Sequence, residues 1–471
     1  MLSTDYLVVG AGASGLAFTD TLVAGSGAEV LLVDRRHAAG GHWCDTYPFV
    51  RLHSPSRYYG VDSAPLGTDR RQVGGDNDGL YEQATGAEVQ DYFDEVLHGT
   101  LVASGRVRFL GGHEHVGGTG THHVVRDLVS GREHEVVVRR SLVDARYLEG
   151  AIPATHTPSF RVAADASFVP VHELPDRVGD VSGCTVIGGG KTGVDACLWL
   201  LEQGVDPDRI RWVRPREAWF HDRATMQPLD LVGRTVESLA VAAEIIAGGD
   251  GPDEMLQQFE DAGQVMRLHP TTLPTMYRGT MLSGRELERL RSVTDVVRLG
   301  RVRAIETHHL VLDEGEVATR PGTLHVDCSS RGLPDSPPVP VFGHHRITLQ
   351  YLRHLSPSFN AALLGWIEAH RGDADEKNRL CLPHPTPSRP GDWAPMLVRS
   401  WQNAARWRNE PDLTSWINGS RVDLGVAAHM RSDPLVRASA ERLRRSVGAA
   451  IEQVGPPPAP SPTAMSAVPP T

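Results

Sequence analysis

Short apolar runs that lead into helix-forming segments are the most regular pattern along this chain. The run DYLVV, Asp5–Val9, leads into LAFTDTLVAG, and the run CTVI, Cys184–Ile187, leads into VDACLWLLEQG. A short apolar run bounded by glycine is typical of a buried strand, and a longer segment with apolar residues on one side is typical of a helix. The pattern therefore predicts two strand–turn–helix units.

Weaker patterns predict the elements between and after these two units. Apolar residues recur at helical spacing over Ala87–Leu97, and alternating runs over Arg106–Val143 predict a small antiparallel meander. The segment Leu229–Val297 is mostly helical in pattern, and we expect it to be an insertion that serves as a lid or an oligomer contact. From about Pro334 the chain is expected to rejoin the first domain. The proline-rich end, 454–471, is expected to be disordered.

Both predicted turns carry a glycine fingerprint of the form GxGxxG. The first reads GAGASG and the second reads GGGKTG. The first glycine makes the tight turn, the second lets the backbone approach a pyrophosphate, and the third lets the helix pack on the strand. The N-terminus of that helix can then bind phosphate. Two bound dinucleotides are therefore expected, and they imply that electrons pass between them. The residues expected to bind them are Gly10, Gly12, Ala13, Ser14, Gly15, Gly188, Gly190, Lys191, Thr192 and Gly193.

Charged residues at the ends of the next predicted strands indicate how each dinucleotide is recognised. Asp34 ends the run EVLLVD, where a carboxylate can accept hydrogen bonds from ribose hydroxyls, and Arg35 follows it. At the second site the strand RIRWV leads into Arg214 and, two residues on, Arg216. Guanidinium groups suit a 2′-phosphate, so this pattern predicts NADPH, with Lys191 adding charge near the pyrophosphate. A solvated surface role stays the alternative for both arginines.

Composition and charge narrow the class of protein. The 471 residues allow two or three domains, and 40% hydrophobic residues with 22% charged residues are ordinary for a soluble enzyme. The net charge of −11 argues against a nucleic-acid partner, which needs a basic patch. No apolar stretch approaches the roughly 20 residues that a membrane span needs. The first predicted strand begins so early that we expect no signal peptide, which favours the cytoplasm.

The cysteines and histidines predict neither disulfides nor a metal site. The five cysteines lie far apart and form no CxxC or CxxxxC pair, which argues against a disulfide framework and against a redox-active dithiol. Adjacent histidines such as His122 and His123 point to opposite faces of a strand, and no Cys/His set has zinc-ligand spacing. We therefore expect no metal.

The two fingerprints and a further motif, GGHW, which ends at Trp43, give the chain a resemblance to a known family. It resembles the flavin-containing monooxygenase superfamily over most of residues 1–350. The resemblance implies an α/β fold with two Rossmann-like dinucleotide-binding domains, in which the first fingerprint holds FAD and the second holds NADPH. It also implies that Gly41, His42 and Trp43 lie beside the flavin. For Trp43 an ordinary core position stays the alternative.

The same layout gives the expected domain boundaries. The FAD-binding domain covers 1–165 and resumes over 326–453, and the NADPH-binding domain is inserted between them over 166–325. The helical insertion lies within the NADPH-binding domain, at about 229–297.

The resemblance also implies an activity. It is that of an FAD- and NADPH-dependent monooxygenase, which uses molecular oxygen and a flavin C4a-(hydro)peroxide to oxygenate a small nucleophilic or carbonyl substrate. The chain departs from the family's motifs at two places, so an FAD-dependent oxidoreductase that inserts no oxygen stays an alternative activity. The family's FxGxxxHxxx(Y/W) linker is absent before the second fingerprint, where the chain reads SFVPVHELPD, and the family's asparagine downstream of the GGHW motif is missing. A nucleotide-binding regulatory protein without turnover is a third, weaker alternative.

A polar segment downstream of the GGHW motif supplies the candidate catalytic residues. It reads YPFVRLHSPSR and contains Arg51, His53 and Ser54. Monooxygenation on a flavin needs no nucleophile triad, but cations and hydrogen-bond donors stabilise a negatively charged reduced flavin. The pattern therefore predicts catalytic roles for these three residues, with a polar surface loop as an equal alternative.

Overall fold

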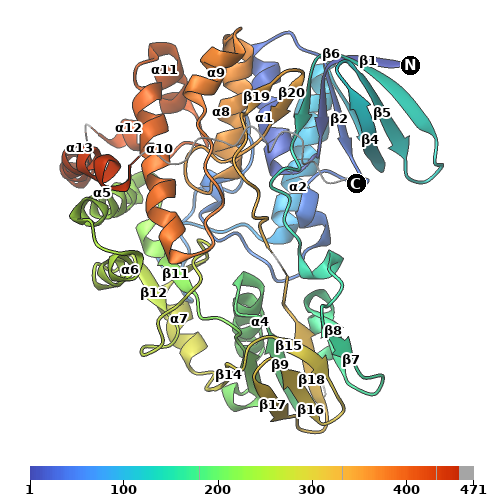
Figure 1. Ribbon diagram of the computed structural model, residues 1–471, viewed down its shortest axis with the longest axis vertical. Helices are drawn as coiled ribbons and strands as arrows, with labels where there is room; N and C mark the ends of the chain where they lie inside the picture. The colour runs from blue at the N-terminus through green and yellow to red at the C-terminus, as the bar shows by residue number, and fades with distance from the viewer. Residues whose placement is uncertain (180, 331, 431, 456–471) are drawn as a thin grey trace.

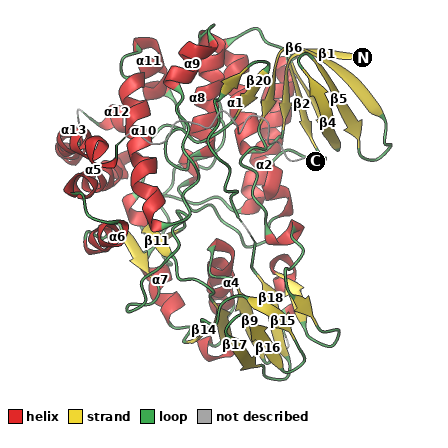
Figure 2. Cartoon of the chain, viewed as in Figure 1, coloured by secondary structure: helices red, strands yellow, loops and turns green. Residues whose placement is uncertain are grey.

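Two largely parallel β-sheets at opposite ends of the molecule organise the fold (Figure 1). The structure is a computed structural model that describes residues 1–179, 181–330, 332–430 and 432–455. Helices lie on one side of the first sheet and continue along that side of the molecule, and long loops cross the region between the two sheets (Figure 2). Most of the expected disordered tail, from residue 456 on, lies outside the described residues.

The first sheet is built around the first fingerprint. β1 (Leu2–Val9) pairs in parallel with β2 (Val30–Asp34) on one side and with β6 (Glu133–Asp144) on the other. β3 (Val107–Gly111) continues the sheet beyond β2. The helix α1 (Ala13–Gly25) connects β1 to β2, which confirms the first predicted strand–turn–helix unit.

Apolar side chains of the first sheet belong to two cores because both of its faces are covered. Leu7 of β1 lies in one core with Val125 of the meander, and Tyr6 lies in the other core with helix residues such as Phe18. The antiparallel meander predicted over Arg106–Val143 is confirmed from His113 on, whereas its first run forms β3, which pairs in parallel with β2. The elements that cover the two faces are β4 (His113–Thr119), β5 (His122–Asp127), α2 (Gly86–Glu95) and α8 (Pro357–His370).

The second sheet is parallel throughout and has the order β14-β10-β9-β18-β8. Its strands and its first helix are β8 (Phe168–Pro170), β9 (Gly183–Ile187), α4 (Lys191–Glu202), β10 (Ile210–Val213), β14 (Asp295–Val297) and β18 (Thr323–Asp327). A smaller sheet shares an apolar core with it and contains β7 (Arg161–Val162), β15 (Val302–Ile305), β16 (His309–Leu312) and β17 (Gly315–Ala318).

The predicted helical insertion differs from the observed segment in two ways. Its last three residues form β14, an edge strand of the second sheet, so the insertion ends before Asp295. It also contributes two strands to a small sheet of its own, of order β12-β11-β13. The elements are β11 (Trp219–Asp222), α5 (Val232–Gly248), α6 (Pro252–Asp261), β12 (Val265–Arg267), β13 (Met281–Leu282) and α7 (Gly284–Arg291).

The last part of the chain returns to the first sheet, as expected. β20 (Arg346–Thr348) pairs with β6, and β19 (Phe342–Gly343) pairs with β20. Further helices follow, of which α13 lies along α5 of the insertion and shares a core with α5 and α10 (Figure 1). They are α9 (Ala374–Leu380), α10 (Trp393–Trp407), α11 (Pro411–Gly419), α12 (Val426–His429) and α13 (Pro434–Val454).

Candidate functional site

The first glycine turn lies between β1 and α1. Gly12 is the N-cap residue of α1, no side chain caps this helix, and its first turn contains no acidic residue. A Cβ atom at Gly15 would collide with the Gly10 carbonyl oxygen, so the third position of the fingerprint admits only glycine. The uncapped N–H groups leave a site for a phosphate.

The second glycine turn has the same construction. Gly190 is the N-cap residue of α4, which also lacks a side-chain cap and an acidic first turn. A Cβ atom at Gly193 would collide with the Gly188 carbonyl oxygen, whereas a Cβ atom at Gly190 would meet nothing within 4 Å. The backbone at Gly190 therefore borders open space, as binding of a pyrophosphate requires. Both turns fit a dinucleotide.

Asp34 ties the first glycine turn to the end of β2. Its buried carboxylate accepts hydrogen bonds from the Ala11 N–H at 2.7 Å and from the Arg36 N–H at 2.8 Å. Each carboxylate oxygen keeps a lone pair that a ribose hydroxyl can use. Arg35 is exposed and pairs with Glu149.

The GGHW motif lies directly against the first glycine turn. A Cβ atom at Gly41 would lie 3.0 Å from the Cα atom of Gly12. Trp43 is buried, and its indole N–H donates to the Tyr59 hydroxyl at 2.7 Å. His42 is exposed, with its ring centroid 5.2 Å from that of Trp43. Trp43 therefore belongs to the core and connects the motif to Tyr59.

Side-chain contacts connect residues 1–165, the first part of the chain, with residues 166–325, the second part. Tyr47, which follows the GGHW motif, donates its hydroxyl to the Asp195 carboxylate on α4 at 2.7 Å. Asp195 also pairs with Lys191 of the second fingerprint, so this lysine, which we expected near the pyrophosphate, has a carboxylate partner within its own helix. The Lys191 charge acts on His53 of the first part as well.

His53 is held between the two parts in its neutral form. Burial and the positive charges of Lys191 and Arg223 lower the pKa of His53 well below its usual range. Its Nδ1 accepts a hydrogen bond from the Met281 N–H at 3.3 Å, so the proton lies on Nε2. Of the two roles that the sequence left open, His53 can therefore act as a hydrogen-bond donor and not as a cation near neutral pH.

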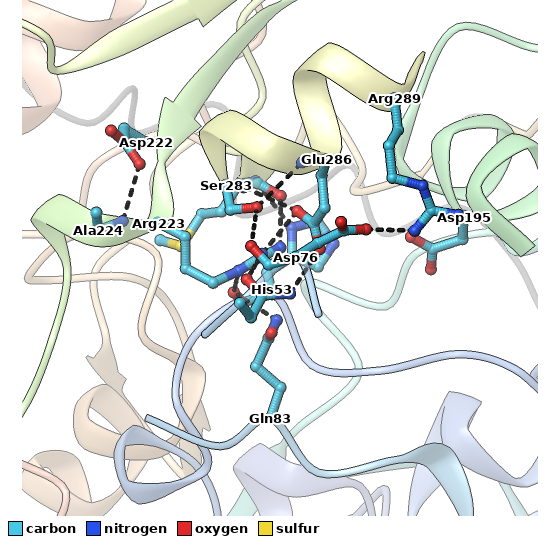
Figure 3. Close-up of polar contacts among 12 residues, drawn as sticks. His53, Asp76, Gln83, Asp195, Asp222, Arg223, Ala224, Ser283, Glu286 and Arg289 are labelled. Atoms are coloured by element: carbon cyan, nitrogen blue, oxygen red, sulfur yellow. Dashed lines mark hydrogen bonds and ion pairs between the residues drawn. The ribbon is translucent and has the colours of Figure 1, made fainter. Parts of the chain in front are cut away.

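A buried ion pair fixes this junction (Figure 3). Arg223, at the end of β11, pairs with Glu286 of α7 at 2.7 Å, and its Nε donates to the His53 carbonyl at 2.9 Å. Glu286 accepts from the Asn77 amide at 2.9 Å and from the Ser283 N–H at 2.8 Å. Sequence reasoning missed this network, although S-x-x-E at Ser283 is a recognisable helix-start signal.

The three predicted catalytic residues have different surroundings. Arg51 is exposed, and its guanidinium donates to the Gln83 carbonyl at 3.3 Å. This placement matches the surface-loop alternative for Arg51. Ser54 lines a cavity of about 170 Å³, which neither Arg51 nor His53 lines among the described residues. The predicted segment thus divides into a surface end and a cavity end.

The cavity lies between the first part, the insertion and the C-terminal helices. Its walls include Tyr58 and Tyr59 of the first part, Ala242 of α5, Phe259 of α6 and Met396 of α10.

Among the described residues no group of three or more metal-ligating side chains could hold a metal ion. Within the same residues, none of the helices is both long and apolar enough to span a membrane.

Acid is expected to destabilise the fold through the cavity histidines. Burial lowers the pKa of His221 to about 4 and that of His354 to about 3, below the value near 6.5 of an unfolded chain. Between these values the unfolded chain binds more protons, so stability present above about pH 6.5 is lost as the pH falls, by up to about 1.4 kcal/mol per pH unit and group. Urea unfolding at pH 7.5 and 5 measures this loss, which His221→Gln should reduce.

The matched control for this prediction is His308→Gln, because His308 is exposed. Its loss of stability between the two pH values should equal that of the unmodified protein. An equal loss in His221→Gln would contradict the assignment.

The arginines after β10 differ sharply in exposure. Arg214 is 5% exposed, pairs with Glu217 at 3.2 Å and lies over the Trp212 ring. Glu217 also pairs with Arg298 at 2.6 Å. This arrangement differs from the exposed phosphate ligand that we expected at Arg214, because its charge is already compensated inside the protein.

Arg216 is exposed and lies in a positive environment. Partial desolvation and the charges of Arg278, Arg301 and Arg389 lower the pKa of Arg216. Arg278 comes from the insertion and Arg389 from the segment before α10, and Arg278 lies 3.5 Å from the Ser388 hydroxyl. A cluster of guanidinium groups at this point suits a phosphate. Sequence reasoning found Arg216 but missed the other three, which are distant in sequence.

Residues 8–59 match the family model of an NAD(P)-binding Rossmann-like domain. Uncharacterized proteins of Mycobacterium tuberculosis, such as Rv2000, and of Mycobacterium bovis, Mb2023, are 42% identical over 424 residues, which cover 90% of this chain and 78% of theirs. The fold is similar to that of an oxidized steroid monooxygenase bound to NADP, with a TM-score of 0.51, 16% identity and coverage of 79% and 87%. It is also similar to a cyclohexanone monooxygenase, with a TM-score of 0.50, 14% identity and coverage of 78% and 88%.

Proposed function

This chain belongs to the family of those mycobacterial proteins, and from that premise and its fold we propose that it is an FAD- and NADPH-dependent monooxygenase. It uses molecular oxygen to oxygenate a small nucleophilic or carbonyl substrate. The observation that carries the proposal is the pairing of two uncapped glycine turns, joined through Tyr47 and Asp195. We expect electrons to pass between two dinucleotides bound at these turns.

The residues proposed to hold the cofactors line the two turns. For FAD they are Gly10, Gly12, Ala13, Ser14, Gly15, Asp34, Arg35, Gly41, His42 and Trp43. For NADPH they are Gly188, Gly190, Lys191, Thr192, Gly193 and Arg216, which has the exposure that a 2′-phosphate ligand needs. Arg214, which the sequence also suggested, is buried and leaves that role to Arg216. The domain boundaries given above remain part of this proposal, with the insertion ending before Asp295.

The chain's own residues prepare the site for this chemistry. Bound FAD supplies hydride uptake from NADPH and activation of oxygen. The N-termini of α1 and α4 orient the two pyrophosphates, and Tyr47 fixes α4 against the first part. His53 stays neutral and offers its Nε2–H as a hydrogen-bond donor. The walls of the cavity beside Ser54 are mostly apolar and offer an apolar surface to a bound molecule.

Arg216→Ala is expected to weaken NADPH binding by about 10- to 100-fold. This factor corresponds to the loss of a charge-assisted hydrogen bond worth about 1.5–3 kcal/mol. NADH lacks the 2′-phosphate, so its binding should change less than twofold. The measurement is the dissociation constant of each nucleotide for the FAD-loaded protein.

Arg214→Ala is the comparison variant for this prediction. Removing Arg214 leaves Glu217 with Arg298 as its remaining ion-pair partner, so we expect a lower melting temperature and a similar effect on both nucleotides. If Arg214→Ala rather than Arg216→Ala selectively weakened NADPH binding, the assignment of Arg216 would be wrong.

Oxygen insertion is tested with the purified FAD-loaded protein. NADPH oxidation is followed under ¹⁸O₂ with a panel of thioethers, ketones and amines, and the products are analysed by mass spectrometry. A monooxygenase incorporates one ¹⁸O atom per product. Stoichiometric hydrogen peroxide with every compound would instead support the oxidoreductase without oxygen insertion.

A further inference from the structure

The cavity beside Ser54 has walls from three parts of the chain that are distant in sequence. Tyr58 and Tyr59 come from the first part, Ala242 from the insertion, and Trp393 from α10. Trp393 stacks on Tyr277 with ring centroids 3.8 Å apart, and its indole N–H donates to the Tyr277 carbonyl at 3.0 Å. The side chains on this wall are therefore held in place, and most of the lining is apolar.

Among the residues that the structure describes, the cavity walls carry no uncompensated charge near neutral pH. Arg353 is the one lining residue of this described set, histidines aside, whose side chain is charged. It pairs with the buried Asp423 at 2.7 Å, and its guanidinium lies 3.4 Å from the centre of the Phe359 ring. His221 bonds to the Tyr277 hydroxyl at 3.1 Å, and burial keeps the pKa of His221 and of His354 far below 7. All charges in the walls are thus neutralised.

Such walls discriminate between ligands by charge. An ammonium or carboxylate ion would leave water without gaining an opposite charge, which is strongly unfavourable. An uncharged apolar molecule gains free energy in proportion to the apolar surface it buries. A cavity of about 150 Å³ with apolar walls is large enough for benzene. The cavity here, at about 170 Å³, therefore suits a molecule the size of one six-membered ring with a small substituent.

We propose that this cavity is the substrate site and that it selects uncharged, mainly apolar molecules of that size over ammonium and carboxylate ions. The proposal rests on the proposed function, because it takes the bound molecule to be the compound that is oxygenated. Among the substrate types left open by the sequence, it favours neutral thioethers and ketones and disfavours protonated amines. Ser54, which lines the cavity, directly follows His53 in the chain, so the cavity lies at the junction of the two parts.

Isothermal titration calorimetry on the FAD-loaded protein, without NADPH, tests the selection directly. The probes are methyl phenyl sulfide, benzylamine and benzoate, which are similar in size and differ in charge at pH 7.5. We expect the sulfide to bind at least tenfold more tightly than either ion. Equal or tighter binding of benzylamine or benzoate would overturn the proposal, and so would an absence of sulfide binding at millimolar concentration.

Filling the cavity tests the location. Ala242→Phe and Leu239→Phe add a ring to two wall positions on α5, and each should weaken sulfide binding at least tenfold. The matched control is Ala438→Phe on α13, where Ala438 is exposed, and its binding should be unchanged. Leu239 is only partly buried, so its variant remains informative if Ala242→Phe does not fold. Unchanged binding in a folded cavity variant would overturn the location.

The outcomes separate this proposal from the proposed function. In one outcome the protein binds the sulfide selectively and yet holds no flavin or does not oxidise NADPH. That result refutes the proposed monooxygenase activity and the role of the sulfide as a substrate analogue. A flavoprotein that oxidises NADPH but ignores the sulfide refutes the cavity assignment alone.

Discussion

Glu286→Gln is expected to lower the free energy of unfolding by about 3 kcal/mol, because it removes one partner of a buried ion pair. The side chains of Arg223 and Glu286 are 4% and 11% exposed, and they lie 2.7 Å apart. Without the carboxylate, the Arg223 guanidinium stays buried with no compensating charge. Three segments meet there, namely the Asn77 loop, the end of β11 and α7, so the loss should loosen the whole junction.

Equilibrium unfolding in urea measures this effect. The matched control is Glu244→Gln, which removes a carboxylate from the exposed pair between Glu244 and Arg442. Exposed pairs contribute about 0–1 kcal/mol, so the control should change stability by no more than that. Replacing both buried partners, as Arg223→Met with Glu286→Leu, should recover part of the loss, since no charge then remains unpaired. Similar losses in Glu286→Gln and Glu244→Gln would contradict the prediction.

Gly190→Val is expected to abolish tight NADPH binding while the protein stays folded. The backbone at Gly190 has a φ of −94°, which any residue adopts, and a Cβ atom there would meet nothing within 4 Å. The added side chain therefore does not disturb the protein, but it occupies the space that the pyrophosphate needs. We expect a dissociation constant for NADPH at least about tenfold higher, equivalent to about 1.4 kcal/mol, with unchanged FAD content.

Gly193→Ala provides the contrasting result in the same turn. Its Cβ atom would collide with the Gly188 carbonyl oxygen, so this variant should lower the melting temperature as well as nucleotide binding. Nucleotide titration and thermal unfolding of both variants distinguish the two effects. Full NADPH affinity in a folded Gly190→Val variant would show that the second turn does not hold the nucleotide.

The two glycine turns could be predicted because their constraints are local. In each turn the third glycine faces a carbonyl oxygen only five residues earlier, Gly10 for Gly15 and Gly188 for Gly193. The strands before them and the helices after them have apolar patterns that identify them without distant contacts. The end of the insertion was predicted wrongly for the opposite reason. β14 has three residues and is defined by its pairing with β10, which lies far away in sequence.

The candidate site shows the same division at the level of single residues. Arg214 and Arg216 lie two positions apart and have the same side chain. Arg214 is buried over Trp212 and pairs with Glu217, which Arg298 of a distant segment also contacts, whereas Arg216 stays exposed among arginines from other segments. Arg51 and Ser54 were equally plausible in the sequence, but only Ser54 reaches the cavity.

The sequence by itself determined the two strand–turn–helix units, their glycine turns and the return of the chain to the first sheet. These features depend on backbone sterics and on apolar periodicity, which act over a few residues. Only the tertiary structure decided the rest: the Tyr47–Asp195 contact, the neutral state of His53, the Arg223–Glu286 pair and the uncharged cavity. Each of these depends on burial and on charges that meet only when distant segments pack together, because desolvation and electrostatic interaction follow distance in space.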